Sequence, residues 1–456
     1  MRARPISLGL LSFLIVVGFA PTRSVLSSNS DISTLLFTVA KRYEPLAWVH
    51  GGERFSSDAT IFLQDAGGRR PLLSGFAASA DPAVSFDGKR VLFAGKQKSQ
   101  DPWQIWEVEL DSVTSSGEPH RLTSCEEDCV RPFYLPEDRF VYAKKTDGRF
   151  VMEAADRADG KGLRLTYGPG SYLPTDVLRD GRILFEASYP LGSDRTPEIY
   201  TVYSDGSGVE AYRCDHGKKR HSGKQVSSGD IVFASGSSLG RFTSARAQEV
   251  AIAAAVGEYA GEIAEASSGD WLLAWRPDAN SNFAVMRWRP GESRMLPVVA
   301  EQNSNAIQPV LVEERAVPKR HPSGLHDWPN ANLLCLNAYT SKYKFAAESI
   351  HSVRLYTRDN AGNPKLLGLA PVERDGSFFV QVSGDEPLQI ELLDSSGKTL
   401  KRESGWFWTR RGEQRACVGC HAGPETAPEN AVPMILLRST TPADMTDAAR
   451  GNAGGQ

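Results

Sequence analysis

The residues best suited to chemistry lie near the end of the chain, in the segment Cys417-Val418-Gly419-Cys420-His421. Two thiols in this spacing can each add to a vinyl group of one porphyrin, and the adjacent imidazole can then bind the iron. The segment therefore predicts covalent attachment of a single haem c by Cys417 and Cys420, with His421 as an iron ligand. A thioredoxin-like redox pair, half of a zinc site and a chance match are the alternatives.

An iron that transfers electrons needs a second strong axial ligand. Met434 is the first candidate, because it follows His421 by thirteen residues, behind a proline-rich loop that can fold over a porphyrin. A core position beside Ile435 is the alternative for this methionine. The other candidate ligands are His321, His326 and His351. Without a second ligand the iron would be open to a small substrate.

A second group of ligand-type side chains comprises Cys214, Asp215, His216 and His221. A thiol, a carboxylate and two imidazoles within eight residues predict a zinc or iron site, or polar groups beside an open haem iron. Three consecutive basic residues precede His221 and would repel a cation unless they point away. A polar loop with solvated or hydrogen-bonded histidines is therefore the alternative.

The remaining cysteines predict structural roles. Cys125 and Cys129 flank three acidic residues, and in an oxidising compartment we expect a local disulfide between them. Cys335 is expected to be a buried thiol. Pairing with Cys214, a metal-binding role and a place beside an open haem iron are the alternatives for Cys335.

Residues 1–24 are typical of an export signal. A basic start is followed by an apolar run from Ile6 to Phe19, and Ala20 or Ser24 offers a small residue at a cleavage site. An uncleaved membrane anchor is the alternative, because a proline follows Ala20. We expect a periplasmic or otherwise extracytoplasmic protein without a stable membrane span after cleavage, which agrees with the compartment of covalent haem attachment.

The amino-acid composition limits the classes of fold and of binding partner that are expected. The chain has 52 Lys+Arg against 55 Asp+Glu, so no basic surface for nucleic acid is expected. Its 456 residues exceed what one hydrophobic core usually supports. The 41 glycines and 27 prolines favour many short strands over long helices.

A repeat is expected between residues 34 and 316. A turn of Asp, Glu or Gly precedes a short apolar run about every 40–50 residues, the period of four-stranded propeller blades. The apolar runs begin at Val91, Phe140, Ile183, Ile231 and Trp271. We expect about six blades, with residues 306–312 returning to complete a partial first blade at residues 34–73.

Two stretches of this repeat resemble TolB-like propellers. They are Ser85-Phe86-Asp87-Gly88-Lys89-Arg90-Val91-Leu92-Phe93 and Asp101-Pro102-Trp103-Gln104-Ile105-Trp106. The resemblance covers roughly residues 40–300 and implies a fold rather than an activity.

Residues 317–438 predict a small β-sandwich-like domain that carries the haem motif. Apolar residues alternate with polar ones after Asp375-Gly376 and again from Leu388 to Leu392, as in half-buried strands. The motif itself is expected on a short helix from Glu413 to Ala422. Residues 439–456 lack apolar periodicity and predict a disordered tail.

Side chains just before the motif could contact the porphyrin. Trp406-Phe407-Trp408 would supply either a ring beside it or part of the core. The basic residues Arg410, Arg411 and Arg415 could bind the haem propionates or stay solvated.

Three stretches are similar to the middle domain of the hydrazine synthase alpha subunit family: residues 370–378, 387–394 and 412–430. Members of that family place a propeller ahead of the haem domain. The resemblance implies this architecture, haem attachment at Cys417 and Cys420, and a ligand role for His421. Position 425 is Glu where the family's active-site haem has a nearby tyrosine, so hydrazine synthesis itself is not expected.

The sequence thus predicts a mainly β, exported protein with a TolB-like propeller and a haem c domain. Its expected function is electron transfer to a redox partner protein, with the propeller as docking scaffold. One alternative is a haem redox enzyme that acts on a small substrate, including nitrogen compounds. The other is a non-redox propeller binding module in which the motif holds zinc or a disulfide.

Overall fold

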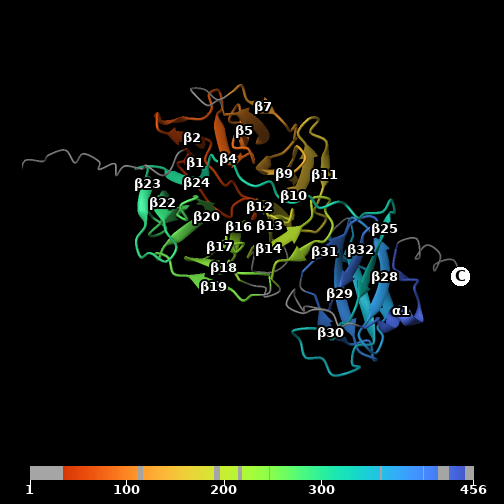
Figure 1. Ribbon diagram of the computed structural model, residues 1–456. Helices are drawn as coiled ribbons and strands as arrows, with labels where there is room; N and C mark the ends of the chain where they lie inside the picture. Colours follow the sequence, from red (N-terminus) through yellow and green to blue (C-terminus); the bar gives the residue numbers. More distant parts are fainter. Residues whose placement is uncertain are drawn as a thin grey trace, which may run out of the picture.

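A computed structural model describes most of the chain. The described residues are 34–110, 117–188, 196–213, 218–245, 247–359, 362–403, 405–419 and 431–446. They form a ring of six four-stranded sheets and, beside it, a smaller domain of two sheets (Figure 1). The predicted export signal lies outside the described residues. Within them, no helix is long and apolar enough to cross a membrane.

Each blade of the ring is an antiparallel sheet. The four strands of each blade are given below from the innermost, at the axis of the ring, to the outermost. Blade 1 comprises β24 (Asn305–Leu311), β1 (Leu35–Ala40), β2 (Thr60–Asp65) and β3 (Gly68–Pro71). Blade 2 comprises β4 (Ala78–Val84), β5 (Arg90–Lys96), β6 (Gln104–Glu109) and β7 (His120–Arg121). Blade 3 comprises β8 (Cys129–Leu135), β9 (Arg139–Thr146), β10 (Arg149–Asp156) and β11 (Gly162–Arg164).

The other three blades follow the same order in the chain. Blade 4 comprises β12 (Ser171–Val177), β13 (Ile183–Ser188), β14 (Glu198–Val202) and β15 (Glu210–Ala211). Blade 5 comprises β16 (His221–Gln225), β17 (Ile231–Ser235), β18 (Ser238–Phe242) and β19 (Val250–Ile252). Blade 6 comprises β20 (Glu258–Glu265), β21 (Trp271–Arg276), β22 (Ala284–Trp288) and β23 (Leu296–Val299). The predicted mainly β, six-bladed propeller is therefore confirmed.

The ring is closed by strands from its two ends. β24 pairs antiparallel with β1, so that Leu35 lies opposite Leu311 and Ala40 opposite Asn305. This pairing matches the expected return of residues 306–312 to the first blade. Closure leaves no exposed sheet edge at the start and end of the ring.

Four glycines explain why the turn signals repeat. Gly88, Gly181, Gly229 and Gly269 follow the innermost strands of four blades, with φ of 72°, 90°, 93° and 83°. Such positive φ values favour glycine, because a side chain would be strained there. Each turn reverses the chain into the buried second strand of its blade.

A disulfide joins Cys125 and Cys129, as expected. It closes a short loop directly before β8, and Cys129 is fully buried. The loop lies between blades 2 and 3.

We expect replacement of both Cys125 and Cys129 by serine to lower the free energy of unfolding by about 2 kcal/mol, the chain-entropy contribution of so short a loop. Urea unfolding of the oxidised proteins measures this difference. Wild-type protein treated with reductant should fall to the stability of the variant. A variant as stable as oxidised wild type would show that the disulfide contributes nothing.

The C-terminal domain is a sandwich of two sheets, as predicted. One sheet has the order β32 (Gln414–Cys417), β25 (Asn330–Cys335), β28 (Phe378–Ser383) and β33 (Ala443–Asp444). The other has the order β27 (Pro364–Pro371), β26 (Ser352–Arg358), β29 (Glu386–Leu393) and β30 (Thr399–Arg402), and β31 (Phe407–Thr409) also pairs with β29. A short helix, α1 (Met434–Arg438), lies between β32 and β33 in the sequence. β28 alternates buried and half-buried residues, as its sequence pattern predicts.

The helix expected from Glu413 to Ala422 is wrong for its first half. Residues Gln414–Cys417 form β32, which runs parallel to β25. Asn332 N–H donates to the Glu413 carbonyl, and Leu336 N–H donates to the Cys417 carbonyl. The sheet therefore binds backbone groups that a helix would have to use internally.

The disordered tail expected from residue 439 is wrong for residues 439–446. β33 pairs parallel with β28, and Met445 is only 3% exposed. Its side chain packs beside Gly368, where an added Cβ would meet Met445 Cγ at 3.2 Å. Thr446 is also buried, and Ala443 packs against the same core. These contacts order a segment that lacks any apolar period.

We expect Met445→Ala to lower the free energy of unfolding of the sandwich domain by about 2–3 kcal/mol, because a buried methionine leaves a cavity. The matched control is Thr441→Ala, at an exposed position of the same segment, which should change stability by less than about 0.5 kcal/mol. Denaturant unfolding compares the two. Equal stability of both variants would contradict the packing role of Met445.

Candidate functional site

The first half of the predicted haem motif ends a strand of the sandwich. Cys417 is the last residue of β32 and lies opposite Cys335, which lies opposite Phe378 in the next strand. Gly419 packs tightly against the loop that follows β25, where an added Cβ would lie 2.1 Å from the Thr340 carbonyl oxygen. Only glycine fits there. Cys420 and His421 lie outside the described residues.

Helix α1 begins at the same end of this sheet. Met434 N–H donates to Asp375 Oδ2 at 2.7 Å, and Ile435 N–H donates to Ser377 Oγ at 3.0 Å. Asp375 and Ser377 belong to the turn that leads into Phe378. Phe378 pairs with Cys335, which in turn pairs with Cys417. Two strand spacings separate the strands of Phe378 and Cys417, about 10 Å. Met434, the candidate axial ligand, thus lies near the motif and not at the far end of the domain.

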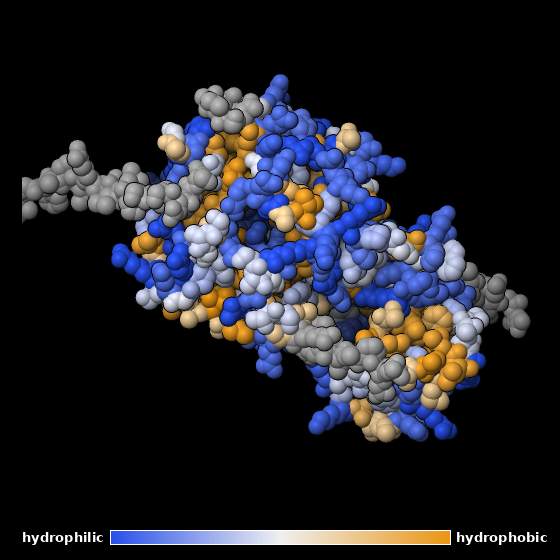
Figure 2. Space-filling model, viewed as in Figure 1, coloured by the Kyte–Doolittle hydropathy of each residue, from blue (hydrophilic) through white to orange (hydrophobic). Residues whose placement is uncertain are grey.

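Large apolar side chains around α1 are unusually exposed. The exposed fractions are 63% for Val432, 39% for Met434 and 73% for Leu437. Figure 2 shows a hydrophobic area on the sandwich domain near α1. Such a surface suits contact with a further apolar group, because isolated soluble domains seldom leave contiguous apolar patches uncovered.

Two of the three alternative histidine ligands lie elsewhere. His321 stacks on Tyr203 of the propeller, with ring centroids 3.6 Å apart. His326 N–H donates to the Gly412 carbonyl, at the beginning of β32, whereas Cys417 is at its end. His351 directly precedes β26 and lies at the motif end of the sandwich, because its carbonyl accepts from Val372 N–H, next to the turn that holds α1. The described structure therefore leaves Met434 and His351 as the candidates at this end.

Residues just before the motif join the two domains. Trp408 is 1% exposed and packs edge-on against Tyr172 of blade 4, with centroids 5.5 Å apart. Its indole N–H donates to the Gly206 carbonyl at 3.3 Å. Trp408 therefore occupies a core position rather than one beside the porphyrin. The propeller provides part of this core.

Two of the three arginines expected at the propionates also bind the propeller. Arg410 pairs with Asp385 at 3.1 Å and donates to the Arg164 carbonyl at 3.2 Å. Arg415 donates to the carbonyls of Trp408 and Val209. Arg411 is exposed. Arg410 and Arg415 thus fix the haem-motif strand against blade 4.

The segment before the second ligand group lies at the same junction. Gly208 N–H donates to Glu413 Oε1 at 3.1 Å, and Val209 accepts from Arg415. Cys214, Asp215 and His216 follow in the sequence, but lie outside the described residues. Among the residues that the structure describes, no three His, Cys, Asp or Glu side chains are grouped to hold a metal ion.

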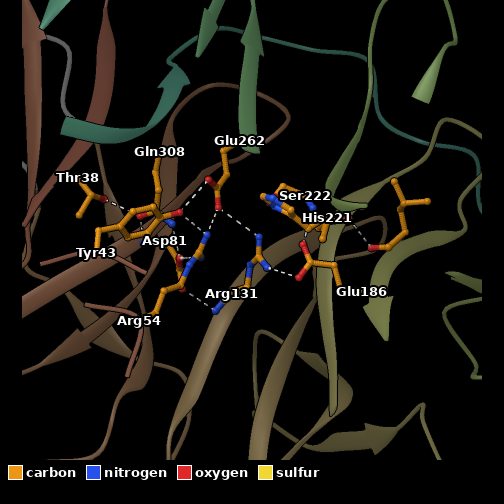
Figure 3. Close-up of polar contacts among 12 residues, drawn as sticks. Thr38, Tyr43, Arg54, Asp81, Arg131, Glu186, His221, Ser222, Glu262 and Gln308 are labelled. Atoms are coloured by element: carbon orange, nitrogen blue, oxygen red, sulfur yellow. Dashed lines mark hydrogen bonds and ion pairs between the residues drawn. The ribbon is translucent and has the colours of Figure 1, made fainter. Parts of the chain in front are cut away.

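His221, the fourth member of that group, faces the axis of the propeller. It is the first residue of β16, is 7% exposed, and its Nδ1 lies 3.1 Å from Ser222 Oγ. Burial lowers the pKa of the His221 imidazole, although Glu186 acts to raise it. The neutral ring therefore belongs to a polar network at the axis (Figure 3).

That axial network was not predicted from the sequence. Arg54 is 1% exposed and pairs with Asp81 at 3.2 Å and with Glu262. Arg131 pairs with Glu186 at 3.4 Å and with Glu262 at 3.3 Å. Five charged groups from separate blades and from the loop after β1 therefore meet at the centre of the ring (Figure 3).

Bulges in the innermost strands aim these side chains at the axis. Asp81, Arg131, Ser222 and Gln308 have φ of 55°, 52°, 55° and 53°, and the register of each of their strands shifts at that point. A bulge re-aims a side chain and accepts proline. The signal available in the sequence was a proline directly after Asp81, Arg131, Leu173 and Gln308.

An aromatic cover closes one end of the axis. The guanidinium of Arg54 lies 5.2–5.4 Å from the ring centroids of Tyr43, Trp48 and Phe55. These rings belong to the connection between β1 and β2. Cation–π contacts and ion pairs together compensate the burial of this arginine.

The described elements form a six-bladed propeller joined to a β-sandwich domain, and the sequence of this domain contains a Cys-x-x-Cys-His segment. Residues 338–422 match the family of the hydrazine synthase alpha subunit middle domain, so the chain carries a hydrazine synthase alpha-like domain. This match confirms the resemblance inferred from the sequence, and it includes the whole five-residue motif.

The similarity to one solved structure covers a longer stretch of the chain. Kuenenia stuttgartiensis hydrazine synthase is 16% identical, with a TM-score of 0.74 over 89% of this chain and 72% of that chain. TolB from Acinetobacter baumannii is 14% identical, with a TM-score of 0.46 over 62% of this chain and 67% of that chain. No curated protein sequence matches the chain. The similarity to hydrazine synthase therefore extends through both domains, as a shared fold.

Proposed function

We propose that the chain is a c-type haem protein in which Cys417 and Cys420 bind one porphyrin covalently and His421 binds its iron. The observation that carries this proposal is the position of the motif, at the end of an anchored strand inside the matched domain. The exposed apolar side chains near α1 fit the faces of a porphyrin. When bound, the haem supplies a one-electron redox centre.

Within this proposal, Met434 is the second axial ligand and the protein transfers electrons. Asp375 and Ser377 hold the first turn of α1 at the motif end of the sheet, and the Met434 side chain is 39% exposed rather than committed to the core. A redox partner protein would receive the electron. The propeller, fixed to the haem domain by Trp408 and Arg410, would serve as the docking scaffold.

Export belongs to the same proposal. Residues 1–24 supply the signal, and the Cys125–Cys129 disulfide supports an oxidising compartment. A periplasmic location is expected after cleavage, and a membrane anchor would follow if the signal were retained. Fractionation of cells that express the full chain distinguishes the two locations.

A second function is favoured by the domain junction. The contacts of Gly208 and Val209 with Glu413 and Arg415 bring the chain that leads to Cys214 against the chain that leads to Cys417. In this version Cys214, Asp215 and His216 ligate a zinc ion or provide polar groups beside an open iron site, whereas His221 remains in the axial network. The protein would then be a redox enzyme acting on a small substrate.

Absorption spectra of the exported, haem-loaded chain separate these two functions. Electron transfer predicts a low-spin spectrum that carbon monoxide does not change, and Met434→Leu should make the reduced protein bind carbon monoxide. Arg438→Ala, which removes an exposed ion pair with Glu373 on the same helix, is the control and should leave the spectrum unchanged. Carbon monoxide binding by the wild type would favour the open enzymatic site instead. Absence of any haem spectrum would overturn both.

A further inference from the structure

A cavity of about 500 Å³ lies along the propeller axis, separate from the haem motif. The innermost strands form its walls, and the axial network with Asp81, Arg131 and Glu262 forms its floor (Figure 3). Beneath the floor, the aromatic cover around Arg54 closes the axis. The cavity is therefore open mainly at its other end, and its volume suits a small ligand.

The linker between the domains borders this open end. Arg315 N–H donates to the Phe86 carbonyl in blade 2, and Lys319 N–H donates to the Arg179 carbonyl in blade 4. Figure 1 shows this segment crossing the ring on its way from β24 to β25. Residues 313–318 thus form a strap over the mouth, and several of them line the cavity.

The floor of the cavity consists of buried ion pairs. Three carboxylates, those of Asp81, Glu186 and Glu262, share two guanidiniums, those of Arg54 and Arg131. The side chain of Glu262 is 22% exposed, whereas the other four are 5% exposed or less. Glu262 is therefore the carboxylate that can meet a ligand.

Glu262 is also ionised. Desolvation acts to raise its pKa, but Arg54 and Arg131 outweigh it and hold the pKa of this carboxyl below its usual value. The neighbouring imidazole of His221 adds no positive charge, because burial lowers its pKa. Its Oε1 is paired with both arginines, whereas its Oε2 accepts from the Tyr43 hydroxyl at 3.4 Å. Oε2 of Glu262 is therefore the oxygen that can accept from an ammonium group of a ligand.

The rim of the cavity offers a cation without a carboxylate partner. Arg315 donates through Nη2 to the Val84 carbonyl at 3.0 Å and lies over the ring of Phe86 at 4.6 Å. Within the described part of the chain, no carboxylate oxygen is within 4.0 Å of its guanidinium. The carboxylates of Asp176, Glu265 and Glu313 also line the cavity. Asp176 attracts the Arg315 guanidinium, but it pairs with Lys224 at 3.8 Å and accepts from Gln225 N–H at 2.8 Å. Glu265 already accepts from Ser227.

We propose that the propeller cavity binds a small zwitterion, with its ammonium group at Glu262 and its carboxylate at Arg315. Molecules from a free amino acid to a tripeptide fit the volume. The inner strands and the strap both contribute to the site, so a bound zwitterion links the propeller to the segment that leads into the haem domain. The site does not depend on the haem.

Isothermal titration calorimetry of the full, haem-loaded chain tests this site with triglycine and 6-aminohexanoate as probes. At least one of them should bind, while the N-acetylated form and the C-terminal amide of the same probe should bind at least tenfold more weakly. Equal binding of the amide would overturn the role of Arg315, and equal binding of the acetylated form would overturn the role of Glu262. No binding of either probe would overturn the proposal.

Variants assign the binding to the cavity. Arg315→Leu and Glu262→Gln should each weaken binding of the probe at least tenfold. Arg320→Leu is the matched control, because Arg320 lies on the same linker with its side chain 67% exposed and pairs with Glu137. It should leave affinity unchanged. Since Glu262→Gln also disturbs the axial network, the Arg315 variant decides the result if the other unfolds, and unchanged affinity in it would overturn the site.

Discussion

Replacement of both Cys417 and Cys420 by alanine is expected to abolish covalent haem retention in the protein exported from a host that attaches c-type haem. No thioether bond to the porphyrin can then form, whereas either cysteine alone could still hold it covalently. Haem-specific peroxidase staining after denaturing electrophoresis measures the effect. We expect at most a few per cent of the wild-type signal per mole of protein, a change well beyond the error of the stain.

Cys335→Ala is the matched control for this experiment. Cys335 lies opposite Cys417 in the neighbouring strand and is 1% exposed, so its loss should reduce stability modestly but leave the stain intact. A stain that survives the double replacement, or one that is lost equally in Cys335→Ala, would contradict the assigned attachment.

Arg54→Leu is expected to destabilise the propeller by about 3–5 kcal/mol, because it leaves two buried carboxylates without their shared cation. Those carboxylates belong to Asp81 and Glu262. Burial already raises the pKa of Asp81, so loss of Arg54 should raise it further and favour its protonation. Urea unfolding followed by tryptophan fluorescence measures the loss.

Two comparisons make the Arg54 result specific. Arg289→Leu removes an ion pair with Asp270 in which the arginine side chain is 52% exposed, and it should cost less than about 1 kcal/mol. Adding Asp81→Asn to Arg54→Leu should recover part of the stability. An Arg54 variant no less stable than the Arg289 variant would show that the axial charges do not support the ring.

Local patterns predicted much of the fold. Gly88 and Gly181 mark turns that only a flexible residue makes easily, and the alternation in β28 reports one buried face. The return of residues 306–312 to β1 followed from the incomplete first blade. These features depend on neighbours in the sequence or on a regular repeat, so a single sequence reveals them.

Long-range pairings could not be predicted in the same way. β32 forms because β25, roughly eighty residues earlier, offers it a parallel edge, and nothing in residues 414–417 indicates that partner. Arg54 meets Asp81 and Glu262 across 27 and 208 positions of sequence. Met445 packs against Gly368 of β27, more than seventy positions earlier in the sequence. In each case the deciding contact comes from a distant element.

For the candidate haem site too, local features could be predicted from the sequence and long-range contacts could not. The motif and its chemistry are visible in the sequence, because the spacing of Cys417, Cys420 and His421 is local. The roles of Trp408 and Arg410 could not be predicted from the sequence. Both residues bind the propeller through contacts that depend on how the two domains meet. The charged floor of the propeller cavity was missed for the same reason.

The intact mass of the exported chain tests the central claim most directly. Denatured protein purified from a host with haem-attachment machinery should have the mass of the polypeptide plus one haem. A mass equal to the polypeptide alone, obtained where a control cytochrome c from the same host carries its haem, would contradict covalent attachment at Cys417 and Cys420.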